Sequence, residues 1–192
     1  MKLGRWLLTF LAFPVGGELA IALLGSLDGP GRAALGGLIV GTVLGVAQWL
    51  ALRGSGIGSR WIAVTAGATG VGLALAAVVT QAGTTLADVV VTGLLTGAAV
   101  GAAQAALLPV GRQLRAAWAA AVSVTWALGW LTTFFVIVDV ERGYYVFGSS
   151  GAVVVTVATG LLMRHLLQVR VSTPPAPTPT PASTPALVTA GR

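Results

Sequence analysis

The stretch GLIVGTVLGVAQW, from Gly37 to Trp49, determines how this chain is organised, because a close copy, GLLTGAAVGAAQA, runs from Gly93 to Ala105. In both copies the glycines stand four residues apart, and a glutamine follows the last glycine by three. On a helix with about 3.6 residues per turn, these positions share one face. Membrane helices associate through small residues that let backbones approach and through polar side chains that bond across the contact. We therefore predict two helix-packing faces, made by Gly37, Gly41 and Gly45 and by Gly93, Gly97 and Gly101.

The composition of the chain is that of a membrane protein. Of its 192 residues 56% are hydrophobic and 8% are charged, against about 25% charged in ordinary soluble domains. The net charge of +6 does not indicate nucleic-acid binding, because no basic patch is interleaved with aromatic residues. The absence of cysteine excludes disulfides, thiolate catalysis and cysteine-ligated metals.

The apolar runs predict an all-α, polytopic membrane protein with six transmembrane helices. They cover about residues 6–24, 34–52, 61–80, 87–108, 117–138 and 149–168. The same eleven-residue interval recurs from Trp6 to Gly17, Trp61 to Gly72 and Trp118 to Gly129. We therefore predict three tandem helical-hairpin repeats, about 6–52, 61–108 and 117–168, in parallel orientation. In the third repeat Met163 stands where the glutamine would be.

The first helix could also be read as a signal peptide, since Lys2 and Arg5 precede it and Ala20-Ile21-Ala22 offers a cleavage site. The recurring tryptophan–glycine interval indicates instead that it belongs to the fold. The predicted transmembrane domain is thus 1–171. Residues 172–192 hold six of the nine prolines and are predicted to form a disordered tail.

Basic residues predict the orientation of the chain in the membrane. Nine arginines and lysines fall at the termini and in the second and fourth loops, whereas the other side holds only Arg32 and Arg142 together with four of the five acids. Cytoplasmic loops are rich in Lys and Arg. Both termini are therefore predicted to be cytoplasmic, in the inner membrane of a bacterium.

The pattern G-x3-G-x3-G-x2-Q-W-x2-L-R at Gly37–Arg53, followed by a basic loop and a helix that opens with Trp61-Ile62-Ala63, resembles a group of small uncharacterised bacterial multi-pass membrane proteins built from such hairpins. The resemblance covers about residues 6–131. This chain departs from the pattern at Ala105 and Pro109, where Trp and Arg would be expected. The resemblance implies the fold and the location and carries no activity.

Glu18 is the one acid inside a predicted span. It lies about 18 Å from Trp6 along a helix, where an ionised carboxylate costs at least about 2.5 kcal/mol. Pro14, Gly16 and Gly17 suggest a broken helix of the kind that lines transport sites. Glu18 is therefore a candidate binding or coupling carboxylate of a small-solute or ion permease. The alternatives are a protonated acid bonded to a neighbouring helix and an acid at the outer interface.

Gln48 and Gln104 are candidates either to coordinate a solute or, as such residues more often do, to tie helices together. The tryptophans that open helices, Trp6, Trp61 and Trp118, are predicted to lie in the interfacial aromatic belt. Two deeper tryptophans, Trp126 and Trp130, are predicted to face lipid or the core.

The run Gly148-Ser149-Ser150-Gly151 matches the G-x-S-G signature of intramembrane serine proteases, and His165 is the only histidine. Fifteen residues separate Ser150 from His165, about 22 Å along one helix, whereas a nucleophile and its base must meet within about 3 Å. We therefore predict a helix N-cap at Ser149 or Ser150, an interfacial histidine and no catalytic residue.

The sequence thus favours a non-enzymatic integral membrane protein that acts structurally or by binding through helix contacts. The alternative is the permease with Glu18. No pattern of metal ligands or cofactor motif is present. The expected partners are the lipid bilayer and either a further copy of the chain or another membrane protein, and not nucleic acid.

Overall fold

The computed structural model describes residues 1–25, 29–136 and 149–172, and every regular element among them is a helix. Within these described ranges, six helical spans of 20 to 25 residues are long and apolar enough to cross a membrane. A helix of about 20 residues covers the roughly 30 Å of hydrocarbon. The prediction of an all-α protein with six such spans is confirmed. The predicted tail from residue 173 onward lies outside the described residues.

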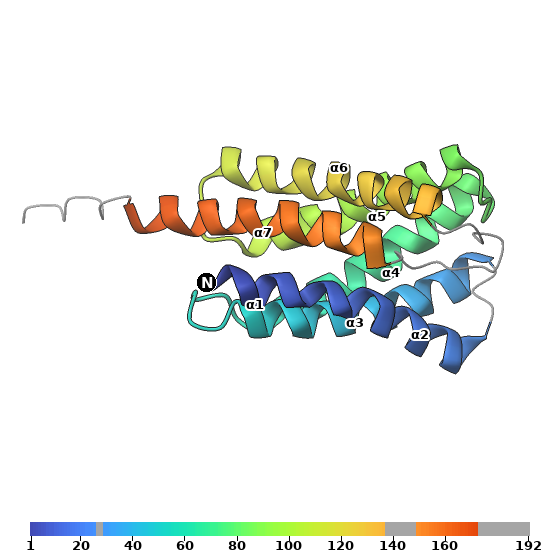
Figure 1. Ribbon diagram of the computed structural model, residues 1–192, viewed down its shortest axis with the longest axis horizontal. Coiled ribbons are helices and arrows are strands. Elements are labelled where there is room, and N and C mark those ends of the chain that lie inside the picture. Colours follow the sequence, from blue (N-terminus) through green and yellow to red (C-terminus); the bar gives the residue numbers. More distant parts are fainter. Residues whose placement is uncertain (26–28, 137–148, 173–192) are drawn as a thin grey trace, which may run out of the picture.

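The spans run along the long axis of the molecule (Figure 1). The first consists of α1 (Leu3–Leu7), a 3₁₀ segment η1 (Leu8–Leu11) and α2 (Ala12–Leu24). The others are α3 (Gly29–Ala51), α4 (Arg60–Thr80), α5 (Leu86–Leu107), α6 (Arg112–Val136) and α7 (Ser149–Ser172). The N-terminus, the α3–α4 turn, the α5–α6 turn and the end of α7 lie at one end of the bundle (Figure 1). We call it the basic end.

Two helices begin five residues before their predicted starts. Helix α3 begins at Gly29 instead of 34, and Pro30 directly after it suits the first turn of a helix, where no amide hydrogen is needed. Helix α6 begins at Arg112 instead of 117, because Arg, Gln and Leu are good helix formers even where the chain is too polar for hydrocarbon. Hydropathy predicted the apolar part of each helix and missed its polar first turn.

The irregularity of the first span lies before Pro14, not at the glycines. Proline lacks an amide hydrogen, and its ring collides with the carbonyl one turn earlier. The chain accordingly takes the tighter 3₁₀ form over Leu8–Leu11 and returns to α-helix in α2, which continues through Gly16 and Gly17. The predicted break with exposed backbone at these glycines is therefore wrong.

Gly16 and Gly17 are both buried. A Cβ at Gly16 would lie 3.0 Å from the Val40 Cα, which is tighter than ordinary van der Waals contact. Glycine at this position thus lets α2 approach the backbone of α3. Helix packing therefore explains the glycine at position 16, which the sequence analysis also considered as part of a solute site.

The turns are built from ordinary local chemistry. Thr85 and Asp88 form a capping box at the start of α5, with the Asp88 amide donating to the Thr85 Oγ1 at 3.3 Å and the Thr85 amide donating to the Asp88 Oδ2 at 3.1 Å. At the basic end Gly54 and Gly56 take φ values of +84° and +80° in the loop that joins α3 to α4, a conformation that glycine adopts at little cost.

Candidate functional site

Each glycine face of the sequence motif lies against the helix that follows it. Added Cβ atoms at Gly37, Gly41 and Gly45 would come within 2.7 to 3.0 Å of Cα atoms of α4, those of Gly70, Ala66 and Ile62. At Gly93, Gly97 and Gly101 they would come within 2.7 to 2.9 Å of Cα atoms of α6, those of Ala127, Ser123 and Ala119. Both stripes therefore lie where two backbones approach closely. The closest pairs, α3 with α4 and α5 with α6, are joined by turns at the basic end.

The two motif glutamines lie together in the buried core. The Gln104 Nε2 donates to the Gln48 Oε1 at 3.0 Å and to the Thr65 Oγ1 at 3.0 Å. The same Gln48 oxygen accepts a hydrogen bond from the Trp61 Nε1 at 2.9 Å. Gln48 is 8% exposed and Gln104 is 1% exposed. These bonds join α3, α4 and α5 at one point, which we call the glutamine cluster (Gln48, Thr65, Gln104 and the Trp61 indole).

The three helix-opening tryptophans are also buried, each with 0% exposure. The Trp118 ring lies between the other two, with ring centroids 6.4 Å from those of Trp6 and Trp61. Edge-to-face and tilted aromatic pairs at this spacing are favourable. The prediction of an interfacial aromatic belt is therefore wrong for these residues, because their rings face one another inside the bundle and not the headgroups.

The indole nitrogens of the triad have different environments. The Trp6 Nε1 donates to the Thr156 carbonyl at 3.2 Å and to the Thr159 Oγ1 at 3.3 Å, which ties the first span to α7. The Trp118 Nε1 is buried and has no hydrogen-bond partner within the described parts of the chain. By analogy with Trp61 and Gln48, its acceptor would be the Gln104 Oε1, but the hydrogen bonds that tie Gln104 to Gln48 and Thr65 use its Nε2.

The deeper tryptophans belong to the core, which was one of the two predicted environments. Trp126 and Trp130 are each 5% exposed. The Trp126 ring meets the Phe13 ring at a centroid distance of 5.6 Å. Aromatic packing therefore continues from the triad along the inside of the bundle.

Glu18 lies on the outer face of α2 and does not join the glutamine cluster. Its side chain is exposed, as are those of its neighbours Val15 and Leu19. It stands six residues before the end of α2 at Leu24, about 9 Å inside that end, whereas Gln48 lies near the opposite, basic end. Of the three candidate binding residues, the structure brings together the two glutamines only.

The candidate protease residues are separated. Ser150 is in the first turn of α7, and its buried Oγ has no hydrogen-bond partner among the described residues. His165 lies four turns further along the same helix and is exposed. A Ser–His pair of the kind that activates a nucleophile is not formed by these two residues. Gly148 lies outside the described residues.

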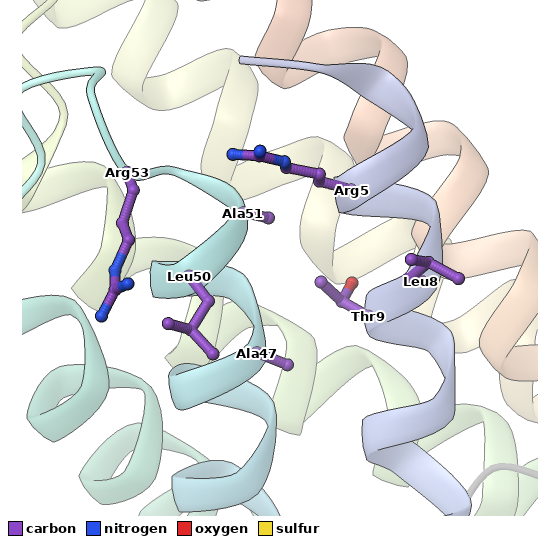
Figure 2. A pocket seen from close by; sticks show the side chains of 7 residues that line it. All are labelled: Arg5, Leu8, Thr9, Ala47, Leu50, Ala51 and Arg53. Carbon is purple, nitrogen blue, oxygen red and sulfur yellow. The ribbon is translucent and has the colours of Figure 1, made fainter.

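A groove at the basic end was not predicted from the sequence. It has a volume of about 470 Å³ and is lined by Arg5, Leu8 and Thr9 from the first span and by Ala47, Leu50, Ala51 and Arg53 from α3. Figure 2 shows Arg5 extending from α1 towards the end of α3, with Thr9 and Ala51 facing each other across the groove. Arg5 and Arg53 are 48 residues apart. Only the antiparallel packing of the two spans brings them to one groove.

Comparison of the chain with family models, curated proteins and solved structures gave no match.

Proposed function

We propose that this protein is a non-enzymatic integral membrane protein that acts structurally or by binding, through the surfaces of a tightly closed helix bundle. The observation that carries the proposal is the glutamine cluster. Its amides, hydroxyl and indole hydrogen-bond to one another, so the polar groups of this cluster are used for helix contact. In lipid such bonds contribute about 0.6 kcal/mol each on average.

The proposed architecture is three tandem hairpin repeats arranged around the tryptophan triad. It is supported by the similar placement of the two glycine faces, which pack on α4 and α6. A third, divergent contact supports it as well: a Cβ at Gly160 of α7 would lie 2.5 Å from the Trp6 Cδ1. The third small-residue helix thus packs on the first tryptophan helix, and this contact closes the ring between the two ends of the chain.

The proposed location is a bacterial inner membrane with both termini in the cytoplasm. Seven basic residues whose side chains are described lie at or near the basic end: Lys2, Arg5, Arg53, Arg60, Arg112, Arg115 and Arg164. Of the two acids with described side chains, Asp88 caps α5 at the other end and Glu18 lies in the half of α2 away from the basic end. This asymmetry is typical of a cytoplasmic basic end.

The alternative function, a permease with Glu18 as its coupling residue, receives no support from the position of this side chain. A coupling carboxylate must meet the solute pathway, but Glu18 faces away from the core. Nor do Gly16 and Gly17 open the backbone, because they are buried in the contact between α2 and α3.

Reconstitution of the purified full-length protein into liposomes loaded with a pH-sensitive dye tests the proposal. We expect proton flux no greater than in protein-free liposomes under an imposed pH gradient and membrane potential. Glu18→Gln should leave both the flux and the folded yield unchanged, whereas Gln104→Met should lower the folded yield. A wild-type flux that Glu18→Gln abolishes, with its fold intact, would overturn the structural proposal in favour of the permease.

A further inference from the structure

The groove at the basic end combines positive charge with an apolar wall. Arg5 and Arg53 stand at its rim and are exposed, and four of its seven lining residues, Leu8, Ala47, Leu50 and Ala51, are apolar. The acids whose side chains the structure describes, Glu18 and Asp88, lie outside it. The Arg5 guanidinium extends over the groove, whereas that of Arg53 points away from it on the far side of α3 (Figure 2). An anion that enters the groove therefore meets one guanidinium directly, with a second positive charge nearby and no carboxylate from the described residues.

The apolar wall continues from the groove onto the outer surface of the bundle. Leu8 is 64% exposed and Leu50 is 41% exposed, although both lie within spans apolar enough to cross a membrane. Leu8 comes from η1 and Leu50 from α3, and in Figure 2 each side chain lies on the outer surface of its own helix beside the groove. A ligand with an anionic head and an apolar chain matches this order of surfaces, whereas a free inorganic anion would leave the apolar wall uncovered.

We propose that this groove binds an anionic phospholipid, with the phosphate at Arg5 and an acyl chain along the apolar surface beside the groove, at Leu8 or Leu50. The site rests on the proposed membrane insertion, and the proposed orientation places it in the cytoplasmic leaflet, which carries anionic lipids. Arginine suits the task because its planar guanidinium donates two parallel hydrogen bonds to a phosphate.

The two arginines have different roles in this site. The Arg53 guanidinium lies over the Trp49 ring, 4.7 Å from its centroid, and this cation–π contact holds the charge beside α3. The Arg5 side chain instead reaches across towards the end of α3 (Figure 2). Arg5 is therefore the direct phosphate ligand, and Arg53 supplies positive potential from the rim.

Native mass spectrometry of the full-length protein in a mild detergent tests the proposal, with dioleoyl phosphatidylglycerol as the anionic probe and dioleoyl phosphatidylcholine as the neutral one. We expect tighter binding of phosphatidylglycerol. Arg5→Gln should weaken it about fivefold, since one basic residue near a lipid surface contributes about that factor. Arg5→Gln/Arg53→Gln should weaken it further.

The matched control is Arg60→Gln/Arg112→Gln, which removes the same charge from two exposed arginines at the basic end that do not line the groove. The control should keep the wild-type affinity. Equal loss in the control would overturn the site and show general surface attraction. If millimolar inorganic phosphate released the lipid, the ligand of the groove would be a free anion and not a phospholipid.

Failure of this site is distinguishable from failure of the proposed function. Proton flux through the protein would overturn the structural role without changing lipid affinity, and a reversed orientation would leave binding in detergent intact. Unchanged phosphatidylglycerol affinity in the folded Arg5→Gln/Arg53→Gln variant would overturn the lipid site alone. Circular dichroism and a melting curve for each variant establish that the fold is intact.

Discussion

At the scale of single residues, the glutamine cluster shows how polar groups are accommodated in an apolar bundle. One oxygen, the Gln48 Oε1, accepts hydrogen bonds from the Trp61 indole and the Gln104 amide. A buried polar group without a partner is costly in hydrocarbon, so a shared acceptor stabilises two donors at once. The cluster thereby fixes the relative positions of three helices at one depth.

A double-mutant cycle measures the bond between Trp61 and Gln48. Trp61→Phe and Gln48→Met each remove one partner of this hydrogen bond, so the double variant loses no more of it than either single variant does. We therefore expect a coupling free energy of about 0.6 kcal/mol, with an upper limit of about 1.7 kcal/mol. Thermal unfolding in detergent gives the four stabilities. The control cycle, Trp118→Phe with Gln48→Met, should give no coupling, since the Trp118 Nε1 bonds to neither glutamine. Equal coupling in both cycles would refute the assignment.

At the scale of helices, the glycine faces set how closely neighbours approach. A Cβ at Gly41 would lie 2.8 Å from both the Ala66 Cα and the Thr65 carbonyl oxygen, and these are backbone atoms that cannot turn aside. Gly67 on α4 is a natural contrast, because a Cβ there would meet nothing within 4 Å. A side chain at position 41 would therefore collide with the backbone of α4, whereas a side chain at position 67 has room.

Gly41→Ala should therefore destabilise the protein, whereas Gly67→Ala should not. We expect Gly41→Ala to destabilise the protein by about 1–3 kcal/mol through overpacking. Gly67→Ala should be neutral or stabilise it by up to about 1 kcal/mol, because alanine favours the helix. Unfolding of both variants in the same detergent makes the comparison. Equal tolerance at the two positions would show that the stripe is not a packing face.

The first span is an integral element of the bundle, with Trp6 and Phe13 buried in its core at 0% and 2% exposure. Removal of a signal peptide at Ala20-Ile21-Ala22 would delete both rings. We therefore expect intact-mass spectrometry of the membrane-purified protein to show the first 24 residues retained. A mass that lacks them would mean that the folded protein has five spans.

At the scale of the whole molecule, the ends of the bundle differ in charge, and this difference predicts its orientation. A reporter that is active only in the periplasm should be inactive when fused after Arg170 and active when fused near Thr84, because the proposed orientation keeps the basic end in the cytoplasm. Activity measurements on the two fusions in whole cells, normalised to fusion abundance, decide the question. The reverse pattern would refute the orientation and leave the fold unaffected.

The sequence alone was sufficient to predict the all-α class and the number of spans. Hydropathy reports how much of each helix can lie in lipid, and this property depends on composition and length alone. The spacing of Gly37, Gly41 and Gly45 also predicted a face, because helical periodicity is local. The sequence could not predict which helix that face would contact, because a stripe of small residues carries no information about its partner. Only the packed structure identified α4 as that helix.

Only the tertiary structure decided how the aromatic and charged residues are used. A tryptophan at the start of a span has the same sequence signature whether it faces headgroups or the core, and the burial of Trp6, Trp61 and Trp118 depends on three helix pairs meeting at one level. Glu18 was likewise a candidate binding or coupling carboxylate because of its depth in the span, but its direction around α2 follows from the packing of Gly16 on α3. The groove between the first span and α3 exists only because these antiparallel spans bring residues that are distant in the sequence to one end. Local periodicity therefore determined the elements, and long-range packing determined which surfaces are available to a ligand.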